Sequence, residues 1–192
     1  SYESDFRYKG YQIVDGKYQL PGLPAVYAAQ EEAQTLKILL EDQVSKVQIT
    51  LLYGVLPEQN IITRSAVIQN LGGGKIYLEK AQAACLDWLS GDYDLISFYG
   101  RHAMERNCQR MEIKHGTQVI GSRRGTSSHQ YNPMMIVAEH EASEDAGSCY
   151  AMSFVYSGNF KGEVSKDQFG QTRALLGLSD ELFSYPLASE ES

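Results

Sequence analysis

The residues that could carry chemistry are few and widely spaced. The four histidines are His102, His115, His129 and His140, and they show neither the H-x-H nor the H-x-x-x-H spacing typical of metal ligands. His129 follows Ser127 and Ser128, but adjacent residues of an extended chain point to opposite faces, and a hydrolase triad is assembled from distant positions. We therefore expect no metal ion, no cofactor and no nucleophilic serine in this chain.

A pair of aspartates is the other candidate for catalysis. Asp92 and Asp94 lie two residues apart in Ser-Gly-Asp-Tyr-Asp, and paired carboxylates are the catalytic groups of glycoside hydrolases. Aspartates in such a turn usually cap the turn and face solvent. Spacing along the chain does not show that two carboxyl groups face one scissile bond, so the structural interpretation is favoured here.

The densest polar stretch runs from Gly121 to Pro133 and contains two arginines, several hydroxyl groups, an imidazole and two amides. Such a segment either satisfies its own hydrogen bonds or binds a polar partner. We favour a largely buried structural network in which His129 and Asn132 bond to backbone groups and the arginines meet carboxylates. Binding of a polar partner is the alternative.

Glycine and cysteine patterns add little chemistry. Gly72-Gly73-Gly74 is followed by Lys75 and a strand rather than by a helix, so it predicts a turn and not a phosphate loop. Cys85, Cys108 and Cys149 are odd in number and far apart, which favours reduced thiols over a disulfide framework or a zinc site.

Alternation of apolar and polar residues predicts the elements that must position these groups. The predicted strands are 35–40, 46–53, 62–68, 75–78, 95–99, 117–120, 134–138, 150–156 and 162–164. The glycine turn at 70–74 would join strands 62–68 and 75–78 as a hairpin. Residues 79–89 have some helical propensity, but period-two alternation favours a strand continuing from Ile76. The acidic run 139–145 predicts a solvated hairpin loop.

Strands recurring about every ten residues predict an all-β fold, a large antiparallel β-sandwich, with residues 1–192 as a single domain. The net charge of −7 with scattered basic residues argues against nucleic acid as a partner. The chain has no apolar run long enough for a membrane span and no leader-like pattern at Ser1–Asp5, so we expect no membrane partner and a cytoplasmic location.

Several stretches together resemble the N-terminal domain of the bacterial family-36 α-galactosidases. The resemblance extends from about Ser4 to Leu187, and its most specific motifs are Ser-Ser-His-Gln at 127–130 and Tyr-Ser-Gly-Asn-Phe at 156–160. The other matching stretches are 4–7, 23–27, 62–65, 92–95, 121–126, 131–133 and 167–173.

This resemblance implies a β-supersandwich that precedes a (β/α)₈ barrel. In the family, two barrel aspartates hydrolyse terminal α-galactosides such as melibiose and raffinose with retention. This chain has no alternating β/α pattern, so we expect residues 1–192 to be a non-catalytic N-terminal domain of a larger glycoside hydrolase. The beginning of the family's N-terminal domain also has no counterpart in the sequence, so we expect this domain to be incomplete. The parent would be an α-galactosidase with α-galactosides as substrates, and relatives imply a homotetramer.

One position departs from the family pattern. In Tyr99–Arg106 the family usually has Trp where His102 stands, and the resemblance places that residue near the galactose pocket, so His102 is the one predicted substrate-binding residue. A surface histidine without substrate contact is the alternative. For the whole chain, the alternatives are a free-standing, lectin-like carbohydrate-binding module and a purely structural assembly domain.

Overall fold

The computed structural model describes residues 4–192, which form two compact units. Unit 1 consists of residues 4–79 and 184–192, and unit 2 consists of residues 80–183. Residues 1–3, on which the expectation about a leader partly rested, lie outside the described residues. Both units are built from antiparallel strands, which confirms the all-β prediction, whereas the single domain over residues 1–192 stays a prediction.

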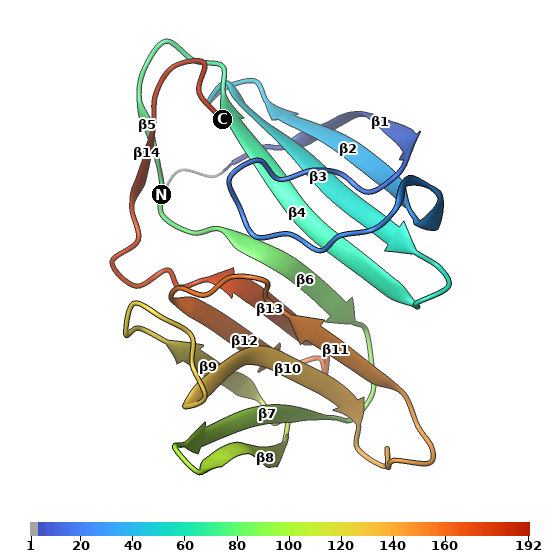
Figure 1. Ribbon diagram of the computed structural model, residues 1–192. Coiled ribbons are helices and arrows are strands. Elements are labelled where there is room, and N and C mark those ends of the chain that lie inside the picture. The colour runs from blue at the N-terminus through green and yellow to red at the C-terminus, as the bar shows by residue number, and fades with distance from the viewer. Residues whose placement is uncertain (1–3) are drawn as a thin grey trace. The chain divides into compact units, whose positions relative to one another are not determined.

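Unit 1 is built around a four-stranded antiparallel sheet. Its strands are β1 (Arg7–Asp15), β2 (Gln34–Asp42), β3 (Val47–Leu56) and β4 (Ile61–Asn70), and they pair in the order of the sequence (Figure 1). A short 3₁₀ helix, η1 (Gln30–Glu32), lies between β1 and β2. The alternation in β2 and β3 places Leu36 opposite Tyr53 and Ile38 opposite Leu51, so both apolar rows share one face of the sheet.

The predicted hairpin across the glycine turn is wrong. The strand after the turn, β5 (Ile76–Leu78), pairs with β14 (Tyr185–Leu187) near the C-terminus and not with β4. The side chain of Asn70 explains this, because its Nδ2 donates to the carbonyl oxygens of Gly74, Leu187 and Ala188 at 2.8–3.1 Å. These contacts direct the chain after the turn toward the C-terminal segment.

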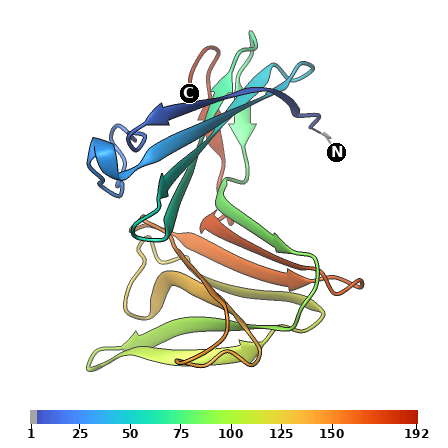
Figure 2. The same ribbon diagram turned by 90° about the vertical axis from the view of Figure 1, so that its right-hand side faces the viewer.

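Unit 2 contains two layers, which Figure 2 shows nearly edge-on. One sheet has the order β11-β10-β7-β8 and the other has the order β12-β13-β6, while β9 lies beside β12. The strands are β6 (Gln82–Trp88), β7 (Tyr93–Arg101), β8 (Met104–Glu112), β9 (Gly116–Ser122), β10 (Tyr131–Glu139), β11 (Cys149–Ser153), β12 (Phe160–Lys166) and β13 (Thr172–Leu178).

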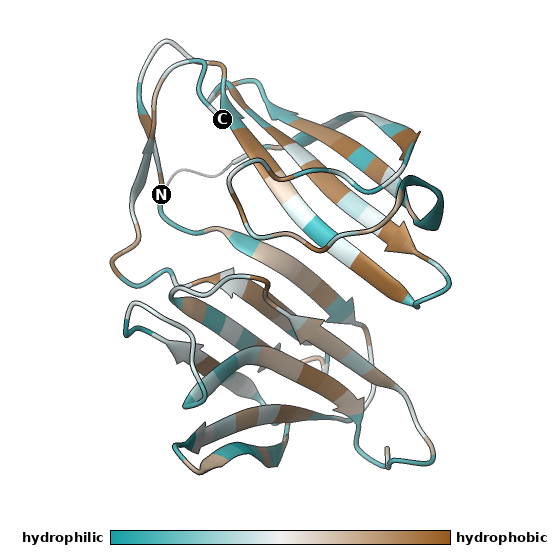
Figure 3. Ribbon diagram, viewed as in Figure 1, coloured by the Kyte–Doolittle hydropathy of each residue, from teal (hydrophilic) through white to brown (hydrophobic). Residues whose placement is uncertain are grey.

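The hydrophobic core of unit 2 lies between these layers. Leu95, Met135, Val137, Val164 and Ala174 have no exposed surface, and they come from four different strands. Figure 3 shows brown, hydrophobic segments along β7 and β10, the strands that carry Leu95, Met135 and Val137. Burial of these apolar side chains is the main stabilising contribution of the two layers.

Most predicted strands are confirmed, including the strand preferred over a helix for residues 79–89. That strand is β6, and residues 79–81 separate it from β5, so it does not continue from Ile76. The acidic run is the loop of the β10–β11 hairpin, as predicted. The alternation test missed β1, β8, β13 and β14, and β11 ends at Ser153 rather than at Tyr156.

Candidate functional site

A polar cleft of about 730 Å³ lies within unit 2. It forms where the C-terminal half of β7, the end of β9, and the first residues of β10 and β12 come together. Its volume is in the range typical of small-molecule pockets. The polar stretch 121–133 supplies one side of the cleft through Arg123, Arg124, Gln130 and Asn132.

The loop between β9 and β10 holds its own shape by hydrogen bonds. Ser122 Oγ donates to the Thr126 carbonyl at 2.7 Å, and the Gly125 amide donates to Asn159 Oδ1 at 2.7 Å. Gly125 has a φ of +82°, a conformation that glycine adopts without steric cost. The Ser127 amide adds a bond of 2.8 Å to the Ser157 carbonyl, so two loops far apart in sequence brace each other.

The predicted network is correct in part, but it is not largely buried, because Arg123, Arg124 and Thr126 are exposed. Arg123 forms an ion pair with Glu181, as expected, whereas Arg124 donates to the neutral amide oxygen of Gln130 rather than to a carboxylate. Asn132 Nδ2 reaches the Phe98 carbonyl only at 3.5 Å.

The prediction for His129 is wrong. Its side chain is exposed and has no hydrogen bond to any of residues 4–192. The loop is therefore held by serine, threonine and asparagine groups at its base, and not by the imidazole.

One lysine that lines the cleft has its charge neutralised. Lys161 Nζ lies 2.8 Å from Glu163 Oε1 and 3.0 Å from Asp180 Oδ1, and these carboxylates raise the pKa of the lysine. Because its charge is compensated, Lys161 serves to hold the start of β12 rather than to attract a ligand.

The β7–β8 hairpin adjoins the cleft through Gly100, which lines it. A Cβ on Gly100 would come 2.4 Å from the Met104 carbonyl oxygen, so the backbones approach too closely for any other residue. Ala103 and Arg106 have φ values of +61° and +59°, which are costly for residues with a side chain. The Glu105 carboxylate accepts from the Ala103 amide at 2.9 Å and fixes the turn.

His102 lies in the turn of this hairpin, and its side chain is exposed. The structure thus places the predicted substrate-binding residue at the tip of the β7–β8 turn. Its contact with substrate stays a prediction.

Asp92 and Asp94 are held in separate ion pairs. Asp92 lies 2.9 Å from Lys166 Nζ, and Asp94 lies 2.6 Å from Arg110 Nε and 2.8 Å from His140 Nδ1. Burial raises the pKa of Asp94, but the hydrogen bonds from His140 and Arg110 outweigh burial and bring this pKa below its usual range. The hydrogen bond from Lys166 likewise lowers the pKa of Asp92. Ionised, paired carboxylates of this kind are poorly suited to act as general acids.

The remaining candidate chemistry is limited. Residues 70–74 form a turn rather than a phosphate loop. Cys85 is half-buried, Cys108 and Cys149 are exposed, and all three are free thiols. Within residues 4–192, no cluster of three or more His, Cys, Asp or Glu side chains could hold a metal ion. In the same part of the chain, no helix has the length and apolar character needed to cross a membrane.

Sequence reasoning missed three residues of the cleft. Tyr99 and Tyr131 are partners in the β7–β10 register, and Glu181 comes from a segment about fifty residues further along the chain. Tyr131 lies inside the singled-out polar stretch, so its position was a usable signal. The contribution of Glu181 depends on tertiary contacts and has no local signal.

Comparison with known families matches residues 1–188 to the glycosyl hydrolase family 36 N-terminal domain. The bifunctional alpha-galactosidase/sucrose kinase AgaSK of Mediterraneibacter gnavus is 60% identical over 189 residues, which are 98% of this chain and 20% of that protein. Alpha-galactosidase AgaA of Geobacillus stearothermophilus is 41% identical over 190 residues, covering 98% of this chain and 26% of that protein.

Solved structures agree with this match. The galactosidase domain of AgaSK gives a TM-score of 0.95 at 61% identity, with 98% of this chain and 26% of that chain covered. The crystal structure of AgaA gives a TM-score of 0.96 at 40% identity, with 100% and 27% covered. This chain therefore spans about a fifth to a quarter of the length of the relatives it matches. These matches show that the chain is a glycosyl hydrolase family 36 N-terminal domain.

Proposed function

We propose that this chain is the non-catalytic N-terminal domain of an α-galactosidase that hydrolyses terminal α-galactosides with retention. The observation that carries the proposal is the family match over residues 1–188, with relatives named as alpha-galactosidases that are four to five times longer. Variants of AgaA have been solved in complex with raffinose and with stachyose, which supports this substrate class. The catalytic carboxylate pair would lie in the remaining part of the parent protein.

The arrangement of the aspartates supports a non-catalytic role for this segment. Asp92 and Asp94 are engaged with Lys166, Arg110 and His140, and no unpaired carboxylate lines the cleft in residues 4–192. In this proposal, the domain contributes to the rim of the substrate pocket through His102 and to assembly of a homotetramer. The exposed side chains of Tyr8, Tyr11 and Ile13 on the edge strand β1 support a role in self-association.

We place the parent protein in the cytoplasm. The three free thiols support this location, because reducing compartments keep cysteines unpaired. Cell fractionation would test the location, and sedimentation of the full-length protein would test the homotetramer.

The first experiment compares the isolated 192-residue chain with the full-length parent. We expect the parent to release nitrophenol from nitrophenyl α-galactoside and the isolated chain to release none. Circular dichroism of the isolated chain controls for its folding. Turnover by the purified, folded segment would contradict the non-catalytic role. A parent without α-galactosidase activity that still binds galactosides would favour the lectin-like alternative.

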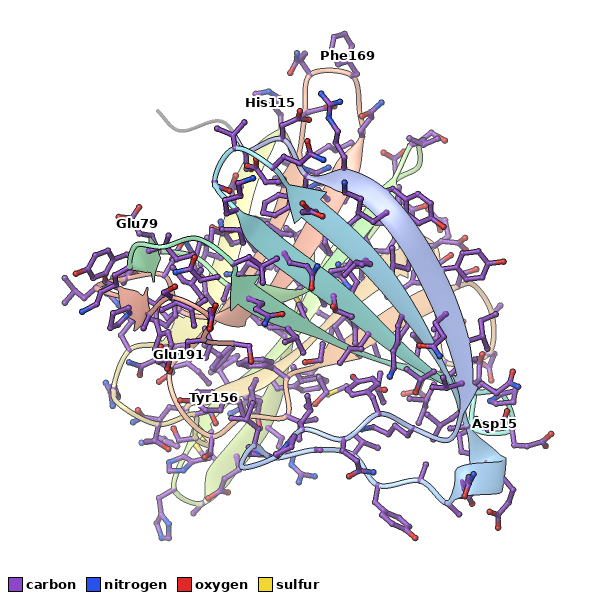
Figure 4. The ribbon with its side chains drawn as sticks, turned by 90° about the horizontal axis from the view of Figure 1, so that it is seen from above. Asp15, Glu79, His115, Tyr156, Phe169 and Glu191 are labelled. Carbon is purple, nitrogen blue, oxygen red and sulfur yellow. The ribbon has the colours of Figure 1, made fainter. Side chains whose placement is uncertain are left out.

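The second experiment tests His102 in the full-length protein. His102→Trp offers a larger apolar face to a sugar, and burying that extra area at about 25 cal/mol per Å² is worth on the order of 1 kcal/mol, or several-fold in KM. A steric clash would instead raise KM. His115→Ala is the matched control, since His115 is also an exposed histidine of unit 2 (Figure 4).

Contact with substrate predicts that His102→Trp and His102→Ala differ in KM for melibiose and raffinose, with unchanged thermal midpoints. Identical kinetics for both variants and the wild type would place His102 outside the pocket.

A further inference from the structure

Two tyrosines form an aromatic wall of the cleft in unit 2. Tyr99 in β7 and Tyr131 in β10 are directly opposite each other in the strand register, and they are 47% and 46% exposed. Their hydroxyl groups have no hydrogen-bond partner among residues 4–192. An aromatic ring with a free hydroxyl presents both an apolar face and a hydrogen-bonding group.

Planar polar groups surround this wall. Arg124 and Gln130 hold each other in place through the bond from the guanidinium to Gln130 Oε1, which leaves the Gln130 amide nitrogen and other guanidinium N–H groups without a partner in the described chain. The Gln109 amide also lines the cleft without a side-chain hydrogen bond to the described residues. These groups supply directional donors and acceptors at fixed positions.

The polar groups at the base of the loop behave differently. The Ser122 hydroxyl, the Gly125 amide and the Ser127 amide are all satisfied within unit 2, at 2.7–2.8 Å. Arg124 and Gln130, whose remaining donors have no partner among residues 4–192, both line the cleft. A framework that is ordered before binding reduces the entropic cost of holding a ligand.

The charge balance of the cleft favours a neutral ligand. Arg123 is paired with Glu181, and Lys161 is paired with Glu163 and Asp180. Arg124 is the one cleft cation that lacks a carboxylate partner among residues 4–192. Arg124 would attract a phosphate or other multivalent anion, but the nearby Glu181 carboxylate would repel it. A polyhydroxyl ligand, in contrast, can hydrogen-bond to the planar groups and pack against the aromatic rings.

We infer that this cleft binds a glycosyl unit of a neutral oligosaccharide of the raffinose type. One sugar ring would lie against Tyr99 and Tyr131, and its hydroxyl groups would bond to Arg124, Gln130 and Gln109. The ligand class rests on the proposed function, because α-galactosides are the substrates proposed for the parent. The cleft itself, with its aromatic wall and unsatisfied planar groups, is a property of this chain.

Calorimetry on the full-length protein tests the inference. Raffinose is titrated in the presence of saturating 1-deoxygalactonojirimycin, an inhibitor present in one AgaA structure, so that hydrolysis does not interfere. We expect binding by the wild type and at least about a fivefold weaker Kd for Tyr131→Ala and for Arg124→Gln. Tyr131→Phe keeps the ring and should lose less than Tyr131→Ala. Tyr77→Ala removes a 60% exposed tyrosine of β5 and is the matched control, with an unchanged Kd.

The outcomes separate the two proposals. Hydrolysis of nitrophenyl α-galactoside by the wild type tests the proposed function alone, and its absence would overturn that function. The inference alone would be overturned if the wild type hydrolyses nitrophenyl α-galactoside but does not bind raffinose in the presence of the inhibitor. It would also be overturned if the Kd for raffinose is the same in Tyr131→Ala, Arg124→Gln and the control. Inorganic phosphate is titrated as a second probe. Phosphate binding that Arg124→Gln abolishes would show an anion site and would also overturn it. Thermal midpoints confirm that each variant is folded.

Discussion

The two units of this chain are stabilised by different means. In unit 2, nine buried apolar residues from five strands and the β8–β9 connection form one continuous core between two layers. In unit 1, fewer apolar residues are fully buried, and the least exposed positions include the polar residues Thr35, Asp42 and Asn70. Sequence composition alone does not separate the two units, because both consist of alternating strands.

Buried polar side chains in unit 1 hold the backbone in place through hydrogen bonds. Thr35 Oγ1 donates to the Gly16 carbonyl at 2.7 Å and accepts from the Tyr18 amide at 2.9 Å. The Asp42 carboxylate accepts from the amides of Val44 and Ser45 and so caps the β2–β3 turn. These bonds from the Val44 amide and its neighbours lower the pKa of Asp42.

This difference predicts which kind of substitution should destabilise each unit most. Loss of apolar volume should affect unit 2 most, since a cavity in a closed core is only partly relaxed by its surroundings. Loss of a polar bond should affect unit 1 most, since buried backbone groups are then left without partners.

The largest effect is expected for a matched pair of core truncations. Leu95→Ala in β7 removes a side chain with no exposed surface, whereas Leu52→Ala in β3 removes one that is 6% exposed. We expect Leu95→Ala to cost about 3–5 kcal/mol of unfolding free energy and Leu52→Ala about 2–3 kcal/mol. Urea denaturation measures both. Equal losses of unfolding free energy would contradict the proposed difference between the two cores.

The next largest effect is expected for Asn70, the buried polar residue at the end of β4. Asn70→Ala removes the amide that bonds to Gly74, Leu187 and Ala188, and it leaves these carbonyl groups unsatisfied. We expect a loss of about 2 kcal/mol and faster hydrogen exchange in β5 and β14 than in the rest of unit 1. Uniform exchange across unit 1 would argue that Asn70 does not specifically hold the C-terminal segment.

A smaller, pH-dependent effect is expected for Asp94→Asn. The Asp94 carboxylate raises the pKa of His140, so their ion pair stabilises the protein below about pH 6.5 and is lost as pH rises through the folded-state pKa. The pKa of Asp94 is lowered, so its contribution disappears in acid, as pH falls through that value. The difference in thermal midpoint between wild type and Asp94→Asn should therefore be largest near about pH 5–6.

The same comparison at alkaline pH isolates the bond between Asp94 and Arg110. His140→Ala is the control variant, and it should remove the change between weakly acidic and alkaline pH while leaving the bond of 2.6 Å to Arg110. A pH profile that is identical in wild type and His140→Ala would contradict this account.

The smallest effect is expected for His129→Ala. An exposed imidazole without a hydrogen bond in the described chain should contribute no more than about 0.5 kcal/mol. Ser122→Ala removes the 2.7 Å bond to Thr126 at the base of the same loop and serves as the comparison, with an expected loss of about 1 kcal/mol. A greater loss of unfolding free energy for His129→Ala than for Ser122→Ala would support the His129 network that was predicted from sequence.

Much of the fold could be predicted because alternation is local. The rows Leu36-Ile38-Leu40 and Val47-Ile49-Leu51 follow the period of a strand, and β2 and β3 appear where those rows predict them. β8 was missed because it contains Glu, Arg, Asn, Gln and Cys on a mostly exposed strand, so its pattern shows no apolar face. β14 was missed because it is short and depends on pairing with β5, more than a hundred residues away.

The all-β class, most strand positions, the polar character of residues 121–133 and the family resemblance could all be predicted from the order of residues along the chain. Which polar groups have hydrogen-bond partners, in contrast, depends on contacts between segments that are far apart in the sequence. Arg123 forms an ion pair with Glu181, whereas Arg124 has no carboxylate partner in the described chain. Tyr99 is the partner of Tyr131 in the strand register. The physical reason is that periodicity fixes the face on which a side chain lies, whereas its partners depend on strand pairing and loop contacts between distant segments.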